Sequence, residues 1–379
     1  NQCQIVPPEL HKRYVAPHEK NIIHEGDVMP AYYGETTNSC RLEECLLKAS
    51  DMIGWKEKGM RTVMPDGKIR ARGVAMAMQG SSISNCDVGS VTVKLSDEGT
   101  YHITVGCTDM GTGCDTIIAQ FAADVLETPI DNISVYGVDT DISPYDSGSY
   151  ASSTTYLTGM AAVKACEQLR ERIIALAAVR MNKDASALTF DGENVIDESD
   201  GAKMSLFDIA TASMCNNEIS LEVTYSHSSP VSPPPFMAAC AEIEADPETG
   251  AIELLDYTAC VDCGTVVNTN LARVQTEGGL LQGIGMTLYE DIWYDERGKN
   301  LSNSFMQYKV PSRLDTDRIR VEFDSSYEPT GPFGAKSIGE IVINTPAPAI
   351  ADAVYNATGV WINELPITPE KILKGMKVI

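Results

Sequence analysis

The residue best suited to acid–base chemistry is Glu340, which follows Gly339 in the stretch GAKSIGEIVINTPAPAIADAVYNATG. Ile338 precedes this pair and three β-branched apolar residues follow it, and burial among such side chains raises the pKa of a carboxyl group. A general base needs a raised pKa, so one interpretation makes Glu340 a proton acceptor. The other interpretation makes it an ordinary acid in the first turn of the helix that the following prolines predict.

Two loops rich in glycine and hydroxyl groups precede predicted helices. One contains Gly111-Thr112-Gly113, and the other is DSGSYASSTT, residues 146–155. Glycine amides, hydroxyl groups and helix N-termini all favour an anionic group, so both loops are candidate sites for a phosphate or a pterin-like group. The alternative is that these hydroxyl groups are helix N-caps. P-loop, Rossmann and G-x-S-x-G motifs are absent, which argues against the enzyme classes they define.

Other polar pairs carry less information. Gln79-Gly80 and Gln282-Gly283 each place a donor and an acceptor beside a glycine, which suits either a ligand contact or helix packing. Cys260 and Cys263 form a single C-x-x-C pair in an apolar stretch, which favours buried core thiols over a metal site. The five histidines form no H-E-x-x-H motif, so a zinc hydrolase is not expected.

Composition limits the partners of this protein. The 379 residues carry a net charge of −24, which argues against binding to nucleic acid or to an anionic membrane surface. No run of about 20 apolar residues occurs that could span a bilayer. The eleven scattered cysteines are typical of reduced thiols, so we expect a cytoplasmic protein. The first residue is Asn1 and not Met, which fits a natural, a processed or a truncated start equally.

Strands and helices are predicted to alternate without regular βαβ spacing. Hairpins are expected at 91–106 and 237–262, strands at 132–138 and 318–324, and helices at 42–55, 117–127, 156–181, 272–291 and 346–359. This pattern predicts an α+β protein of mixed sheets with packed helices. We expect an N-terminal helical or linker segment at 1–60, followed by two halves of one module at 61–216 and 217–379, the latter with Glu340.

Five stretches, in order, resemble motifs of the molybdenum hydroxylases, the family of xanthine dehydrogenase and aldehyde oxidoreductase. They are NIIHEGDV, TVGCTDMGTGCDTIIAQFAADVLETP, SGSYASSTTYLTGMAAVKAC, DCGTVVNTNLARVQTEGGLLQGIG and the C-terminal stretch from Gly334 to Ile372. The last resembles the family signature K-x-x-G-E followed by L-P-x-T-P-E. Lys336, Gly339 and Glu340 match its first part, and residues 365–370 match its second part.

The resemblance implies a two-part molybdopterin-binding module. The molybdenum would be held by a pterin dithiolene, in the dinucleotide form, with a sulfido or selenido ligand and no protein side chain on the metal. Glu340 would be the general base of a hydroxylation that uses water. The residues that the resemblance assigns to cofactor binding are Gly111, Thr112, Gly113, Ser149, Ala151, Ser152, Ser153, Thr154, Gln282 and Gly339.

Two departures from the family pattern bear on the cofactor contact and on the substrate. Thr112 stands where the family carries a glutamine, and its shorter side chain reaches less far. The stretch GSSISNC occupies the region where purine-oxidising members carry a stacking phenylalanine, so Ser81 and Ser82 are expected to line the substrate pocket. The resemblance implies an N-heteroaromatic substrate, nicotinate-like or purine-like. The two serines argue against xanthine-type stacking and favour a smaller or more polar ring such as a pyridine carboxylate, as in the split-subunit nicotinate dehydrogenases. The alternatives are an aldehyde or carbon monoxide oxidising member, or a non-catalytic scaffold.

The sequence lacks the upstream half of the family's molybdenum subunit, its iron–sulfur cysteine motifs and its flavin domain. The resemblance therefore implies a multi-subunit complex. The partner chains would be a second molybdopterin-binding chain, a 2Fe-2S subunit and an FAD subunit.

Overall fold

The computed structural model describes residues 4–5, 22–30, 32–216, 220–312, 314–315 and 318–379. The chain forms two compact units that interleave along the sequence. Unit 1 comprises Asn1–Gln79, Pro233–Pro329 and Ile338–Ile379, and unit 2 comprises Gly80–Ser232 and Thr330–Ser337. The domain division expected from the sequence, into the consecutive segments 1–60, 61–216 and 217–379, differs from these two interleaved units and remains a proposal. Residues 1–3, 6–21 and 31 of the first segment lie outside the described residues.

Unit 1 is built on a mixed sheet in which the strands follow the order β1-β5-β13-β14-β15, with β4 paired to β5. The strands are β1 (Gln4–Ile5), β4 (Arg61–Val63), β5 (Ile69–Met78), β13 (Phe236–Ala245), β14 (Ile252–Asp262) and β15 (Ile319–Phe323). Strands β14 and β15 are parallel, and the other pairs are antiparallel. The hairpin predicted at 237–262 is confirmed by β13 and β14, and the strand predicted at 318–324 is confirmed by β15. A short hairpin, β2 (Val28–Met29) and β3 (Glu35–Thr36), lies outside this sheet.

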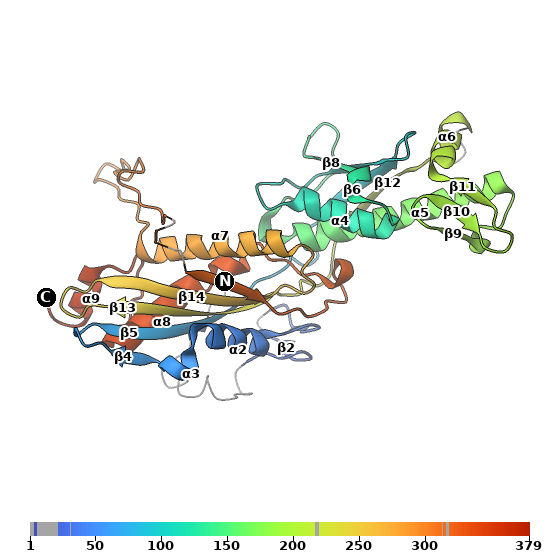
Figure 1. Ribbon diagram of the computed structural model, residues 1–379. Coiled ribbons are helices and arrows are strands. Elements are labelled where there is room, and N and C mark those ends of the chain that lie inside the picture. The colour runs from blue at the N-terminus through green and yellow to red at the C-terminus, as the bar shows by residue number, and fades with distance from the viewer. Residues whose placement is uncertain (1–3, 6–21, 31, 217–219, 313, 316–317) are drawn as a thin grey trace. The chain divides into compact units, whose positions relative to one another are not determined.

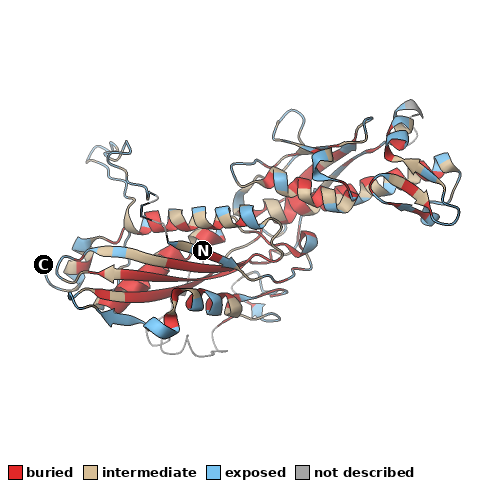
Figure 2. Ribbon diagram, viewed as in Figure 1, coloured by how far each residue is buried: buried red, intermediate tan, exposed pale blue. Residues whose placement is uncertain are grey.

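Helices cover both faces of this sheet (Figure 1). They are α2 (Leu42–Ile53) on one face, α7 (Thr269–Leu288) and α8 (Pro346–Thr358) on the other, with α3 (Trp55–Lys58) and α9 (Pro369–Gly375) at the margins. Along β5, Ala75 joins the core beneath α8, whereas the next side chain, Met76, joins the core beneath α2. Because both faces are covered, the central strands are buried along almost their whole length (Figure 2).

Helix α8 lies very close to the centre of β5. A methyl group at Gly73 would lie 2.2 Å from the carbonyl oxygen of Ala349 and 2.3 Å from the amide nitrogen of Ala353. The amide of Val74 donates a buried hydrogen bond of 3.0 Å to Asp352 on the same helix. Glycine in β5 thus permits the close contact that holds the middle of α8 against the sheet.

Unit 2 contains a sheet of order β12-β6-β7-β8 and a smaller sheet of order β11-β10-β9. Its elements are β6 (Gly89–Leu95), β7 (Tyr101–Val105), α4 (Cys114–Leu126), β8 (Ile133–Gly137), α5 (Gly159–Met181), β9 (Leu188–Phe190), β10 (Asn194–Asp197), β11 (Lys203–Ser205), α6 (Leu206–Asn216) and β12 (Glu222–His227). One hydrophobic core joins the larger sheet to α4 and α5. The hairpin predicted at 91–106 is confirmed by β6 and β7, and the helices predicted at 117–127 and 156–181 are confirmed by α4 and α5. The mixed sheets with packed helices confirm the α+β prediction.

Two further expectations can be compared with the structure. Cys260 and Cys263 are buried and form no disulfide, as the interpretation of core thiols predicted. Within the described part of the chain, no helix combines the length and the apolar character needed to cross a bilayer.

Candidate functional site

The Gly111-Thr112-Gly113 turn connects β7 to the first turn of α4 in unit 2. Gly111 and Gly113 have φ angles of +98° and +77°, in the region that favours glycine. The carboxylate of Asp109 accepts hydrogen bonds from the amides of Gly111 (2.9 Å), Gly113 (3.1 Å) and Asp115 (3.4 Å). The amides of Gly111 and Gly113, which the sequence analysis expected to bind a ligand, therefore already donate to the carboxylate of Asp109.

Partial burial alone would raise the pKa of Asp109, but the backbone amides outweigh that effect and hold it below its ordinary value of 3.8. We expect Asp109→Asn to destabilise the protein by about 1 kcal/mol, because hydrogen bonds to a charged acceptor are strong but partly screened here. A depressed pKa adds stability above pH 3.8 that is lost as the pH falls through the folded value. Urea unfolding should therefore show a constant difference at neutral pH that shrinks as the pH falls below 3.8. A difference unchanged at pH 3 would contradict the charged contact.

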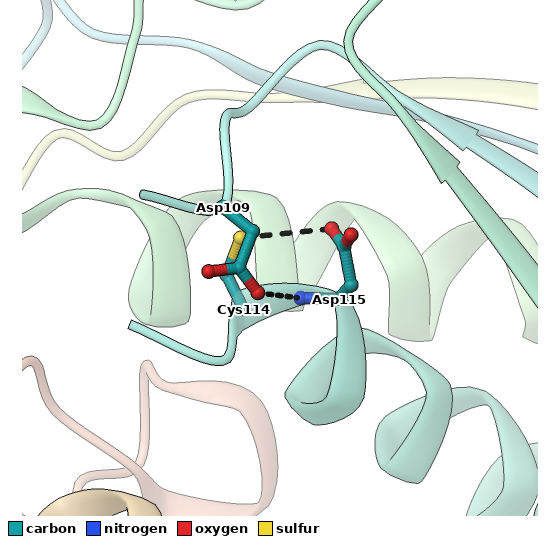
Figure 3. Close-up of side chains that lie close together, drawn as sticks. All are labelled: Asp109, Cys114 and Asp115. Carbon is teal, nitrogen blue, oxygen red and sulfur yellow. Dashed lines mark hydrogen bonds between the residues drawn. The ribbon is translucent and has the colours of Figure 1, made fainter. Parts of the chain in front are cut away.

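Asp109, Cys114 and Asp115 bring their side chains together at this turn (Figure 3). The Cys114 thiol donates to Asp115 Oδ1 at 3.7 Å, and Asp109 is engaged by the amides. These hydrogen bonds explain why the three side chains lie together: they stabilise the turn. We therefore assign no metal ion to this cluster. The same Asx-type geometry could have been read from an aspartate two residues before a glycine.

The second loop is organised by Asp146. Its carboxylate accepts from the amide of Gly148 at 2.8 Å and from the hydroxyl of Thr158 at 2.9 Å. The hydroxyl of Ser153 donates to the carbonyl oxygen of Gly148 at 2.9 Å, so this serine is used within the loop. The sequence places Asp146 in this loop, but no local pattern indicates that its carboxylate organises the loop.

Ala151 and Ser152 have positive φ angles of 51° and 57°, which residues other than glycine seldom adopt. Such backbone strain persists only where the surroundings enforce it, and it concentrates at functional sites. A π-helical turn, Thr154–Thr158, then leads into α5. The predicted cofactor loop is therefore a specific strained structure and not a regular helix cap.

Within unit 2 the two loops lie side by side. The hydroxyl of Ser149 donates to the carbonyl oxygen of Thr108 at 3.3 Å. A methyl group at Gly106 would lie 2.4 Å from the carbonyl oxygen of Pro144 and 2.6 Å from Cβ of Asp146. The segment that leads from β7 to the Gly111–Gly113 turn thus contacts the second loop at Pro144, Asp146 and Ser149.

Thr154 carries a buried hydroxyl that has no hydrogen-bond partner among the described residues. We expect Thr154→Val to stabilise the cofactor-free protein by about 1 kcal/mol and to lower its pterin content, because the variant loses a donor that only a ligand would use. As the control, Thr158→Val removes a hydroxyl bonded to Asp146 and should destabilise the protein. Urea unfolding and pterin quantification measure both effects. A Thr154→Val protein with unchanged pterin content would contradict this assignment.

Ser81 and Ser82 are buried in unit 2, with exposed fractions of 0% and 4%. The hydroxyl of Ser81 accepts from the amide of Ser337 at 3.2 Å, and its amide donates to Ser232 at the same distance. The hydroxyl of Ser82 has no partner among the described residues. That these two serines line a substrate pocket remains a prediction. The buried hydroxyl of Ser82, which has no partner among the described residues, supports it better than the bonded hydroxyl of Ser81.

Glu340 lies in unit 1 at the start of a short 3-10 helix, η6 (Ile341–Ile343), and its side chain makes no capping hydrogen bond there. Ile341 and Val342 are buried, but Glu340 is exposed. The expectation that apolar neighbours bury the carboxylate is therefore wrong for this chain by itself. The tight turn sends the following side chains into the core and leaves the acid at the surface.

Helix α7 supports the backbone that carries this acid. Nε2 of Gln275 donates to the carbonyl oxygen of Gly339 at 3.1 Å. Methyl groups at Gly279 and Gly283 would lie 2.2 Å from Val342 Cγ2 and 2.6 Å from Pro346 Cγ. Sequence analysis did not single out Gln275, although it lies in a quoted motif. Gln282 is exposed on the same helix.

We expect Gly279→Ala to destabilise the protein by about 1–3 kcal/mol, because the added methyl overlaps a buried valine. The neighbouring Gly278→Ala is the matched control, since nothing lies within 4 Å of its added methyl. Urea unfolding measures both, and turnover of the assembled enzyme should fall for Gly279→Ala alone. Equal unfolding midpoints for the two variants would contradict the close packing of α7 against η6.

A polar groove of 490 Å³ lies elsewhere in unit 1, and none of the predicted site residues lines it. Three of its charged side chains are paired with one another, since Glu242 contacts both the buried Arg72 and, at 2.7 Å, Lys58. We assign this groove no ligand.

The residues of unit 2 fit a molybdopterin group. The unpartnered hydroxyl of Thr154 needs an acceptor, and open space faces Gly111. A hydroxyl donor suits pterin and phosphate oxygens.

Comparison with known proteins agrees with this fit. The profile of the molybdopterin cofactor-binding domain matches residues 48–317. The chain belongs to this family, which includes the molybdenum-binding subunits of the molybdenum hydroxylases.

Individual relatives are larger proteins. The chain is 37% identical to a probable hypoxanthine oxidase, XdhD, of Escherichia coli K12, covering 95% of this chain and 39% of that protein. It is 30% identical to a putative xanthine dehydrogenase molybdenum-binding subunit, XdhA, of the same organism, covering 93% and 48%. The structure of quinoline 2-oxidoreductase from Pseudomonas putida 86 superposes with a TM-score of 0.82 at 25% identity, covering 92% and 48%. Aldehyde oxidoreductase and carbon monoxide dehydrogenase chains also match. This chain thus spans less than half the length of these relatives.

Proposed function

We propose that this chain is the part of a molybdenum hydroxylase that carries the general base, and that the complete enzyme hydroxylates an electron-poor carbon of an N-heteroaromatic substrate with oxygen from water. The observation that carries the proposal is the Gly339-Glu340 turn, whose backbone is held on α7 by Gln275 and whose carboxylate is left accessible.

The residues of the chain would have distinct tasks. When bound, the molybdenum cofactor supplies the redox chemistry that amino-acid side chains lack. In unit 2, Gly111, Thr112, Gly113 and the loop from Ser149 to Thr154 would orient the pterin and its phosphates. Gln282 and Gly339 are the cofactor-binding residues proposed for unit 1. Glu340 would accept a proton at its carboxylate, which requires the ionised form.

The substrate class is supported by the names of relatives, since hypoxanthine, xanthine and quinoline are all N-heteroaromatic. Oxidation of an aldehyde or of carbon monoxide is the second candidate, because such enzymes also match. We further propose the dinucleotide form of the cofactor, a second molybdopterin-binding chain, 2Fe-2S and FAD subunits, and a cytoplasmic location.

Elemental analysis of the natively purified complex, with a mass inventory of its chains, tests this function. We expect molybdenum near one per chain and iron on a partner chain. A panel of hypoxanthine, nicotinate, quinoline and benzaldehyde then tests the substrate class, and turnover of benzaldehyde alone would select the second candidate. An intact complex without molybdenum would mean a scaffold that kept the fold.

A further inference from the structure

A long excursion of unit 1, residues 289–312, follows the end of α7 and precedes β15; we call it the arm (Figure 1). It carries an unusual number of exposed large apolar side chains. They are Ile292, Trp293, Tyr294, Leu301, Phe305, Met306 and Val310. Phe305 and Met306 are each 81% exposed.

The arm is held in shape by its own hydrogen bonds. The amide of Leu301 donates to the carbonyl oxygen of Trp293 at 2.7 Å, across a turn in which Asp295 accepts from the amide of Lys299 at 2.9 Å. At its base, the hydroxyl of Tyr308 donates to Glu290. A structured segment that presents apolar groups loses little conformational entropy when a partner covers it.

Exposed apolar groups in such number mark an interaction surface and not a solvated loop. The charge of the arm supports this, because it holds four acidic and three basic residues in a chain of net charge −24. A partner chain would therefore meet little repulsion here. Long excursions without regular structure inside a compact unit are also typically functional.

We propose that the arm is the docking surface for the complementary portion of the molybdenum-binding subunit, meaning the part of the relatives' chains that this chain does not span. The inference rests on the proposed function. Relatives carry both portions in one polypeptide, of which this chain matches 39% and 48%. Portions that are covalently joined in relatives form a permanent contact when separate, and permanent interfaces are the apolar ones.

Oxidative footprinting of the native complex tests the docking directly. Met306 is more exposed in this chain than Met214 on α6, at 81% against 66%, so without docking it should oxidise at least as fast. We expect it to oxidise about tenfold more slowly, because a docked partner excludes water from the interface centre. Lysine cross-links from Lys299 and Lys309 should then reach the complementary chain. Equal oxidation, or cross-links to a second copy of this chain or to an iron–sulfur chain instead, would overturn the proposal.

A pair of double variants provides the second test. Phe305→Ser with Met306→Ser should weaken retention of the complementary chain by about tenfold or more in native mass spectrometry. The matched control is Phe207→Ser with Met214→Ser, whose residue types are the same and whose exposed fractions are 59% and 66%. An intact complex in the arm variant would overturn the docking. If the complex lacks molybdenum but loses the complementary chain only in the arm variant, the proposed function fails while the docking surface stands.

Discussion

Glu340→Gln is expected to lower kcat by about 10²–10⁴-fold while the molybdenum and pterin contents stay unchanged, since this is the usual contribution of a general base. Glutamine has nearly the same shape as glutamate but cannot accept the proton. Glu340 is exposed, so a replacement of nearly the same shape should not disturb folding. Steady-state turnover of the assembled complex, with elemental analysis of the same preparation, measures both quantities.

The matched control is Glu364→Gln, which removes another exposed acid from unit 1. Its side chain has no role in the proposed chemistry, so turnover should stay within about twofold of the wild type, a change well under 1 kcal/mol. Near-normal activity of Glu340→Gln would remove the base assignment and leave Glu340 as a surface residue at a helix start. Loss of molybdenum from that variant would instead assign Glu340 to cofactor retention.

Gly73→Ala is expected to produce the largest loss of stability, about 3 kcal/mol or more, because its added methyl meets backbone atoms. Ala349 and Ala353 are fully buried in α8, and their backbone atoms cannot move without displacing the helix from β5. Such a shift would also disturb the buried hydrogen bond from Val74 to Asp352. Urea unfolding should show a lower midpoint, and α8 should become accessible to proteolysis.

Gly278→Ala again serves as the control, because its methyl enters open space on a helix surface. Alanine favours helix over glycine by about 0.5–1 kcal/mol, so this variant should be neutral or slightly more stable. A Gly73→Ala protein that unfolds at the wild-type midpoint would show that α8 and β5 are less closely packed than described.

Local patterns predicted the elements whose signals are contained in neighbouring residues. The hairpin at 237–262 and the helix ending at Gly359 were correct, because alternation, turn residues, a starting proline and a terminal glycine are all local. Strand β5 was missed for a physical reason. It is buried on both faces between α2 and α8, so its apolar residues do not alternate with polar ones.

The sequence by itself determined the candidate base, the two ligand loops and the family resemblance, since these depend on residue types at short spacing. Only the tertiary structure decided that Glu340 lies at the surface and that Asp109 already occupies the amides of Gly111 and Gly113. It also decided that Gln275 supports the Gly339 carbonyl. These outcomes depend on pairings between segments such as β5 and β13, which lie more than a hundred residues apart. Burial and hydrogen-bond partners are properties of such pairings, so no local pattern contains them.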